Sequence, residues 1–182
     1  MFFLLKSTRV RKINMRFEIQ KWIDNIILRK RSDEVTPSEH RNLVKLWEDM
    51  IKFIKDPDNK GVWLAAPQIG INKRLIVVSL LRTYDDNTFK TIMMINPKIL
   101  WSSDEFELDN EWCLSVPRRY WDVLRSKSIK VSYLDNKWKE NALLLSWISA
   151  RIIQHEVDHL DWVLFVDKLV EKENILPKNH TF

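Results

Sequence analysis

The segment His155-Glu156-Val157-Asp158-His159 constrains the fold of this 182-residue chain more than any other feature. Histidines four residues apart lie together on one face of an α-helix, where both imidazoles can reach one metal ion with Glu156 beside them. The surrounding sequence predicts such a helix over residues 144–160, because apolar residues recur at helical spacing and proline is absent. The alternative is a chance match on an amphipathic helix that buries one histidine.

Length and composition predict one globular domain, since 45% of the residues are hydrophobic and 30% are charged. A helix is expected from Thr36 to about Asp56, where a polar cap and a proline precede apolar residues at helical spacing. Runs of β-branched and aliphatic residues predict strands at 75–81, 91–95 and 129–134, and a short closing strand at 163–166. Together these elements predict an α+β fold with mixed or antiparallel sheets packed around the metal-binding helix, plus an N-terminal helix.

The net charge of +5 comes from the N-terminal segment, because residues 18–182 carry no net charge. No direct nucleic-acid binding is therefore expected of the folded part. Residues 1–17 are predicted to be a disordered basic extension, or an untranslated one if Met15 is the true start, with an organelle transit peptide as the alternative. Residues 18–182 form the predicted catalytic domain, and no apolar run is long enough to cross a membrane.

A catalytic metal site with three protein ligands needs one more ligand besides the two histidines. The downstream candidates Glu171, Glu173 and His180 lie in a short terminal segment around Pro177, with no second helix to hold them. Upstream, Cys113 is the single cysteine, and a lone cysteine is more often a buried, unreactive side chain than a ligand. The residues alone leave the third ligand open.

Three segments, in order, resemble the motifs of peptide deformylases. GVWLAAPQIG at 61–70 is similar to GxGLAAPQ(I/V)G, EWCLS at 111–115 to EGCLS, and HEVDHLD at 155–161 to HExDHLxG. The resemblance covers most of residues 20–170, and three ordered motifs make chance similarity improbable. It implies a hydrolase of linear amides that removes the N-formyl group from the formyl-methionine of newly synthesised proteins.

The resemblance also implies the roles of individual residues. Cys113, His155 and His159 would bind the metal, and Glu156 would act as acid and base. The Gln68 side chain and the Leu114 backbone N–H would donate hydrogen bonds to the developing oxyanion. The pocket for the methionine side chain would be lined by six residues: Val62, Trp63, Glu111, Trp112, Ile148 and Ile152. For Val62, Ile148 and Ile152 the alternative is ordinary core packing.

The expected cofactor is one divalent ion, Fe²⁺ in cells, with Zn²⁺ or Ni²⁺ able to occupy the same site. The expected partners are formyl-methionyl nascent peptides in the cytoplasm, or in an organelle if residues 1–17 are a transit peptide. The ribosome is a further partner of some bacterial relatives, although residues 170–182 lack their basic C-terminal helix. Two other functions stay open: an HExxH zinc peptidase, and an inactive homologue that binds metal or formylated N-termini without turnover.

Glycine and tryptophan occur in unusual numbers, with 2 glycines and 9 tryptophans in the chain. An average chain contains about 7% glycine. Six tryptophans stand where deformylases commonly have glycine: Trp63, Trp112, Trp121, Trp138, Trp147 and Trp162. The chain is either a divergent homologue with a filled groove, or the product of UGA codons that mean glycine in its organism. We favour the second interpretation, because independent drift has no reason to select the largest side chain each time.

Overall fold

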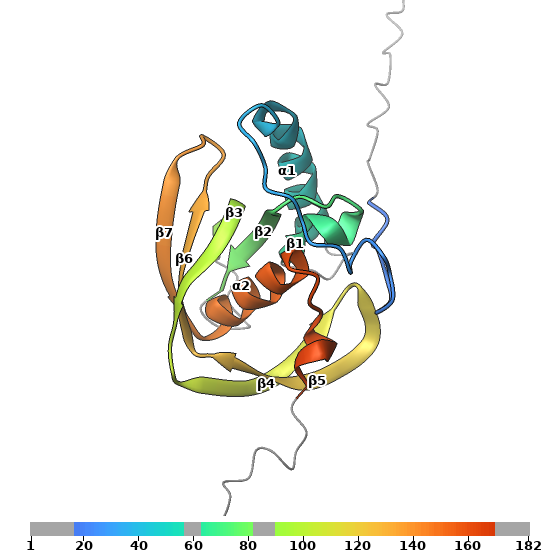
Figure 1. Ribbon diagram of the computed structural model, residues 1–182, viewed down its shortest axis with the longest axis vertical. Helices are drawn as coiled ribbons and strands as arrows, with labels where there is room; N and C mark the ends of the chain where they lie inside the picture. Colours follow the sequence, from blue (N-terminus) through green and yellow to red (C-terminus); the bar gives the residue numbers. More distant parts are fainter. Residues whose placement is uncertain (1–16, 57–62, 82–89, 170–182) are drawn as a thin grey trace, which may run out of the picture.

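The computed structural model describes residues 17–56, 63–81 and 90–169 (Figure 1). The predicted basic extension up to residue 16, Val62 and the segment from residue 170 onward lie outside the described residues. No helix in the described ranges is long and apolar enough to cross a membrane.

The larger sheet has five antiparallel strands in the order β1-β2-β3-β6-β7. Its strands are β1 (Trp63–Ala65), β2 (Leu75–Leu80), β3 (Lys90–Ser102), β6 (Ser128–Leu134) and β7 (Glu140–Ser146). The strands predicted at 75–81, 91–95 and 129–134 are thereby confirmed. A separate two-stranded sheet pairs β4 (Phe106–Cys113) with β5 (Val116–Ser126).

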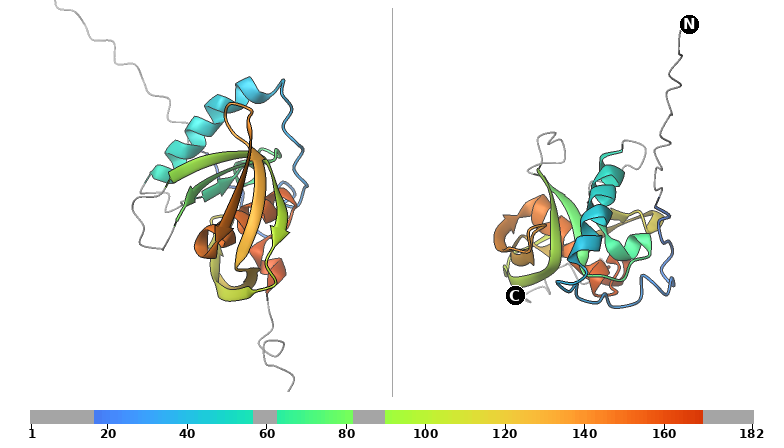
Figure 2. Two further views of the ribbon diagram at one scale, coloured as in Figure 1. Left: turned by 90° about the vertical axis from the view of Figure 1, so that its left-hand side faces the viewer. Right: turned by 90° about the horizontal axis from the view of Figure 1, so that it is seen from above.

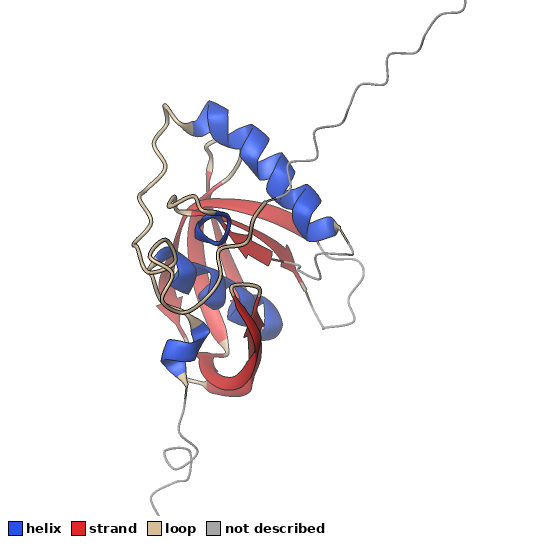
Figure 3. Ribbon diagram, turned by 90° about the vertical axis from the view of Figure 1, so that its right-hand side faces the viewer, coloured by secondary structure: helices blue, strands red, loops and turns tan. Residues whose placement is uncertain are grey.

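Two helices cover opposite faces of the larger sheet (Figures 2 and 3). The side chains of β2 alternate between them: Leu75 and Val77 belong to the core cluster beneath α1 (His40–Lys55), while Ile76 and Val78 pack in the cluster beneath α2 (Trp147–Leu160). This explains why β2 reads as a continuous apolar run, since both of its faces are buried. The predicted α+β class is confirmed.

The N-terminal helix begins later than the predicted Thr36. Residues 36–39 form a turn before the helix instead, in which the Thr36 backbone N–H and hydroxyl both donate to the Glu39 carboxylate at 2.9 Å. Helical residues start at His40, and the helix ends at Lys55, next to the predicted Asp56.

Two predictions around the HExxH helix were wrong. Residues 144–146 belong to β7 rather than to the helix, because Leu143 and Leu145 pair with β6 and pack against the core while Leu144 faces solvent. The predicted strand at 163–166 is replaced by a 3₁₀-helix, η3 (Phe165–Lys168). Its start is fixed by the Asp167 carboxylate, which accepts a hydrogen bond from the Leu164 N–H at 2.8 Å and overrides the β propensity of the apolar run.

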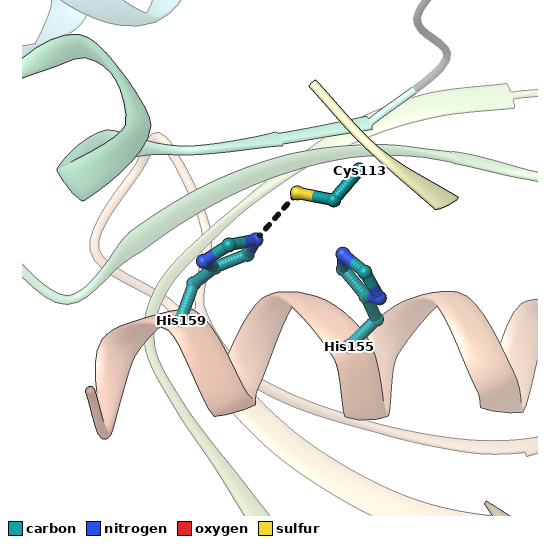
Figure 4. A group of neighbouring side chains, drawn as sticks. All are labelled: Cys113, His155 and His159. Atoms are coloured by element: carbon teal, nitrogen blue, oxygen red, sulfur yellow. Dashed lines mark hydrogen bonds between the residues drawn. The ribbon is translucent and has the colours of Figure 1, made fainter. Parts of the chain in front are cut away.

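The helix α2 lies between the larger sheet and the β4–β5 hairpin (Figure 1). Its apolar residues Ala150, Ile153 and Leu160 are fully buried in the core. The opposite side of the helix turns His155 and His159 toward the hairpin, where β4 ends in Cys113 (Figure 4). The fold thus brings a strand end and one helix face together.

Candidate metal centre

Cys113, His155 and His159 form a buried cluster of three possible metal ligands (Figure 4). One ligand atom from each residue lies within 4.8 Å of the others. The Cys113 Sγ lies 3.2 Å from His159 Nε2. The two histidines therefore lie on one face of the helix, as their spacing predicts. The structure places Cys113, from the end of β4, next to that face.

The orientation of His155 is fixed by Glu111. His155 Nδ1 lies 2.9 Å from Glu111 Oε2. Because an ionised carboxylate can only accept a hydrogen bond, Nδ1 carries the proton and the lone pair resides on Nε2. Within the described residues, His155 Nε2 is buried and has no hydrogen-bond partner. This is the arrangement of a histidine that binds a metal through one nitrogen and is oriented through the other.

Glu111 is itself held by two buried arginines. Arg125 donates to both of its carboxylate oxygens, at 2.7 and 2.9 Å, and Arg151 donates to one of them at 2.8 Å. Burial alone would raise the pKa of Glu111, but hydrogen bonds from Arg125 and His155 lower it well below its usual value. Arg125 also pairs with Asp158, the residue before His159. The charged network therefore locks the ligand-bearing helix to the hairpin.

Glu156 is completely buried beside the cluster. Its Oε1 lies 4.0 Å from His155 Nε2, and neither carboxylate oxygen has a hydrogen-bond partner among the described residues. Burial raises the pKa of Glu156 well above its ordinary value, and Glu111 and Asp158 raise it further despite the opposing charge of Arg125. A carboxyl group in this state can exchange a proton with a small molecule that enters the site.

Gln68 projects toward the cysteine from the 3₁₀-helix η2 (Ala66–Ile69). Its Oε1 accepts a hydrogen bond from the Ala65 N–H at 2.8 Å, which fixes the orientation of the amide. Its Nε2 then donates to Cys113 Sγ at 3.3 Å and to Ser115 Oγ at 3.2 Å. Leu114 follows Cys113 at the tip of the hairpin and lines an adjoining cavity.

The donor set fits a divalent transition metal. A thiolate and two imidazoles suit Fe²⁺ as well as Zn²⁺. Burial, followed by the charge of Glu156, raises the pKa of the Cys113 thiol to about 12, so the thiolate form needs a cation beside it. The unpartnered atoms of His155 and Glu156 point to the same need.

A small cavity of about 40 Å³ lies next to His155, among the residues predicted to line the methionine pocket. Five of the six predicted residues line it: Trp63, Glu111, Trp112, Ile148 and Ile152. Val62 lies outside the described residues. The indole rings of Trp63 and Trp112 are in contact at a tilt of 45°, with centroids 6.1 Å apart. Since about 10 to 15 Å³ is needed for one water molecule, the cavity has room for roughly three.

Sequence reasoning missed Arg125 and Arg151. A signal for Arg151 was present, because it precedes His155 by four residues and so shares the face of α2 that bears the ligands. Arg125 carries no such signal, since only the hairpin register brings it to Glu111.

A buried Cys, His, His cluster with both histidines on an HExxH helix, beside a buried glutamate that has no hydrogen-bond partner among the described residues, is typical of the class of metal-dependent hydrolases. The chain matches the family model described as polypeptide deformylase over residues 17–174. It therefore belongs to the polypeptide deformylase family, whose members are metal-dependent hydrolases that remove N-formyl groups from nascent proteins.

Similar proteins of known sequence and structure agree with this assignment. A peptide deformylase of Prochlorococcus marinus is 39% identical over 148 residues, covering 79% of this chain and 72% of that protein. A crystal structure of a probable peptide deformylase from Synechococcus phage S-SSM7 is 40% identical, with a TM-score of 0.74 over 85% of this chain and 100% of that one. The Met-Ala-Ser-bound deformylase of Acinetobacter baumannii is 32% identical, with a TM-score of 0.77 over 86% and 100% of the chains.

Proposed function

We propose that this deformylase holds one divalent metal between Cys113, His155 and His159, with Fe²⁺ as the ion used in cells. The observation that carries the proposal is the buried cluster whose ligand atoms lie within 4.8 Å of one another. Such an ion, when bound, polarises water and the formyl oxygen and lowers the pKa of the water.

Glu156 moves the proton in this proposal. It receives a proton from the attacking water and passes it to the amine that leaves when the formyl C–N bond breaks. The role is supported by its complete burial and by two carboxylate oxygens without partners among the described residues. Burial also raises the pKa of Glu156, which favours its protonated form as the amine departs.

Gln68 and Leu114 stabilise the negative charge that develops on the formyl oxygen. The Gln68 amide is held by Ala65, so its N–H groups stay directed at the cluster without reorganisation. The Leu114 backbone N–H is the second donor, at the hairpin tip beside Cys113.

The substrate is the formyl-methionyl end of a nascent chain. Its methionine side chain enters the cavity between Ile148, Ile152 and Glu111, and its backbone lies along β1. β1 forms one edge of the larger sheet, so an extended peptide can pair with its outer side. Trp63 and Trp112 line the same cavity. For the peptide to reach the metal, these positions must carry small residues or their indole rings must move aside.

We further propose that residues 18–182 act as one catalytic domain in the cytoplasm, with an organelle as the alternative if residues 1–17 are a transit peptide. Ribosome docking, if used, falls to the basic N-terminal segment, because residues 170–182 contain few basic residues and Pro177.

The test is hydrolysis of a formyl-methionyl peptide after anaerobic loading with Fe²⁺. The chain as printed is compared with one carrying glycine at positions 63, 112, 121, 138, 147 and 162. Activity in either chain that disappears in Glu156→Gln, with metal content unchanged, supports the assignment. Bound metal without activity in both chains indicates the inactive homologue, and hydrolysis of internal peptide bonds indicates the zinc peptidase.

A further inference from the structure

Four tryptophans occupy backbone positions that favour glycine. Among the described residues other than glycine, positive φ angles occur at Trp22 (80°), Trp138 (61°), Trp147 (58°) and Trp162 (57°), and at two further residues. An L-residue in this left-handed region brings its Cβ unfavourably close to the following carbonyl oxygen. The preference for tryptophan here has no steric explanation, because bulky residues are disfavoured in this region.

The hydrogen bonds around two of these residues define turns that normally contain glycine. Val163 N–H donates to Asp158 O at 2.9 Å across the end of α2, which places Trp162 at the left-handed position of a Schellman motif. In the β6–β7 hairpin, Trp138 N–H donates to Asp135 O at 2.9 Å, and Trp138 occupies the left-handed position that follows such a turn. Gly70, with a φ of 85°, ends η2 in the same way.

The indole rings gain little burial in return. Trp22, Trp147 and Trp162 remain 62%, 55% and 48% exposed. Trp138 is the partial exception, because it packs against the core cluster under α1 and against the His40 ring. Trp47, by contrast, lies within α1 and has an ordinary helical backbone.

We propose that the native polypeptide carries glycine at positions 22, 138, 147 and 162, because the gene has UGA codons there and the organism reads UGA as glycine. The positive φ angles support glycine at all four positions without any reference to sequence motifs. Position 22 is supported by its φ angle only, because it lies in none of the three deformylase motifs. The same interpretation places glycine at 63 and 112, where two indole rings now line the small cavity next to His155.

The test combines the codons of the gene with peptide mass spectrometry of the protein purified from its own cells. We expect UGA codons and peptide masses that correspond to glycine at all four positions. Tryptophan masses at these positions, or UGG codons in the gene, would overturn the proposal. Peptides that contain Trp47 serve as the internal comparison, since the backbone there does not require glycine.

A second inference comes from the charge around a larger cavity of about 500 Å³ that adjoins the metal centre. Cys113 and Leu114 line its inner end, and Lys21, Arg118 and Arg119 lie at its exposed rim. Its lining contains no aspartate or glutamate. No ion pair involves Lys21 or Arg118 in the part of the chain that the structure describes, and Arg119 lies over the Trp121 ring at 5.5 Å.

The cavity begins at Cys113 and opens at the surface, so a peptide whose first residue is held at the metal centre can continue into it. We propose that Arg118, Arg119 and Lys21 select nascent chains with an acidic side chain two or three residues after the methionine. The inference rests on the proposed substrate site. Each exposed ion pair contributes about 0.2–1 kcal/mol, so two pairs correspond to a preference of roughly two- to thirtyfold.

The test compares kcat/KM for formyl-Met-Ala-Glu, formyl-Met-Ala-Ser and formyl-Met-Ala-Lys. We expect the order Glu, Ser, Lys, a smaller spread at high salt, and a reversed order in the double variant Arg118→Glu, Arg119→Glu. The double variant Lys98→Glu, Lys130→Glu, on exposed positions of β3 and β6, is the matched charge change and should leave the order unchanged. Equal rates for the three peptides would overturn this inference alone, whereas failure of the neutral peptide in both the printed chain and its glycine version would overturn the proposed function.

Discussion

Replacement of Trp162 by glycine should stabilise this protein relative to replacement by alanine. Within a helix or strand, a protein with glycine is less stable than one with alanine by roughly 0.5–1 kcal/mol, because glycine gives the unfolded chain more conformational freedom. With a φ of 57°, however, position 162 imposes the left-handed penalty on alanine and not on glycine. That penalty is roughly 1–2 kcal/mol, so glycine should exceed alanine by about 1 kcal/mol.

The alanine variant separates backbone strain from the loss of the indole ring. Both replacements remove the contact between the ring and the Arg31 guanidinium, which lies 6.0 Å from the ring centroid. Both also keep the hydrogen bond from Arg29 to the backbone oxygen of residue 162, at 3.2 Å. The difference between the two variants therefore reports the backbone alone.

Urea denaturation at neutral pH measures the difference as a change in midpoint at constant m-value. Trp121 provides the matched control, because it lies in β5 without a positive φ and should show the ordinary order, alanine above glycine. If Trp162→Gly is less stable than Trp162→Ala, the backbone strain attributed to position 162 is refuted.

Three further changes test the site and the folded domain. Cys113→Ser should reduce bound metal per protein by more than about tenfold. Even the loss of a residue that only hydrogen-bonds to a metal ligand weakens metal binding roughly 10- to 100-fold. Retention of the metal would show that the third ligand is another residue. Arg125→Met should lower the free energy of unfolding by about 3–5 kcal/mol, because it leaves the buried Glu111 carboxylate underpaired; a loss below about 1 kcal/mol would contradict the network. A hydrogen bond from Lys73, and then those from Thr36, lower the pKa of Glu39 from 4.5 to about 2. The ionised carboxylate therefore stabilises the fold fully above pH 4.5, and this stabilisation is lost as the pH falls toward 2. The urea midpoint of Glu39→Gln should accordingly lie below that of the unsubstituted protein at neutral pH, and the difference should shrink between pH 4.5 and pH 2. A difference that stays constant over this range would show that the Glu39 carboxylate does not link stability to pH.

The periodicity of apolar residues predicted the helices and strands whose side chains are buried in a regular pattern. The helix at α2 and the strands at β2, β3 and β6 follow from regular apolar spacing. The β4–β5 hairpin was missed, because most of its residues are exposed or half-buried and its charges break the apolar pattern. The strand β7 was assigned in part to the helix, because three consecutive leucines do not distinguish the two periods.

The cluster of candidate metal ligands could be predicted because two of its residues share a helix face and the third lies in a recognisable motif. The charged network behind them could not, since buried and exposed arginines look alike in a sequence. Glu111 was expected only to line the pocket, whereas its carboxylate also orients His155. The left-handed backbone at Trp22 was also invisible, since it depends on the contact of Trp22 N–H with Ser115 O at 2.9 Å.

The three candidate ligands come from two separate parts of the fold. Cys113 ends the two-stranded sheet and the histidines belong to the helix, so a bound ion cross-links two parts of the chain that are distant in sequence. A ligand that binds only the folded state stabilises it in proportion to its occupancy. Removal of the ion should therefore release the hairpin from α2 first, and the β4 and β5 amides should exchange hydrogen faster than those of β2 and β3.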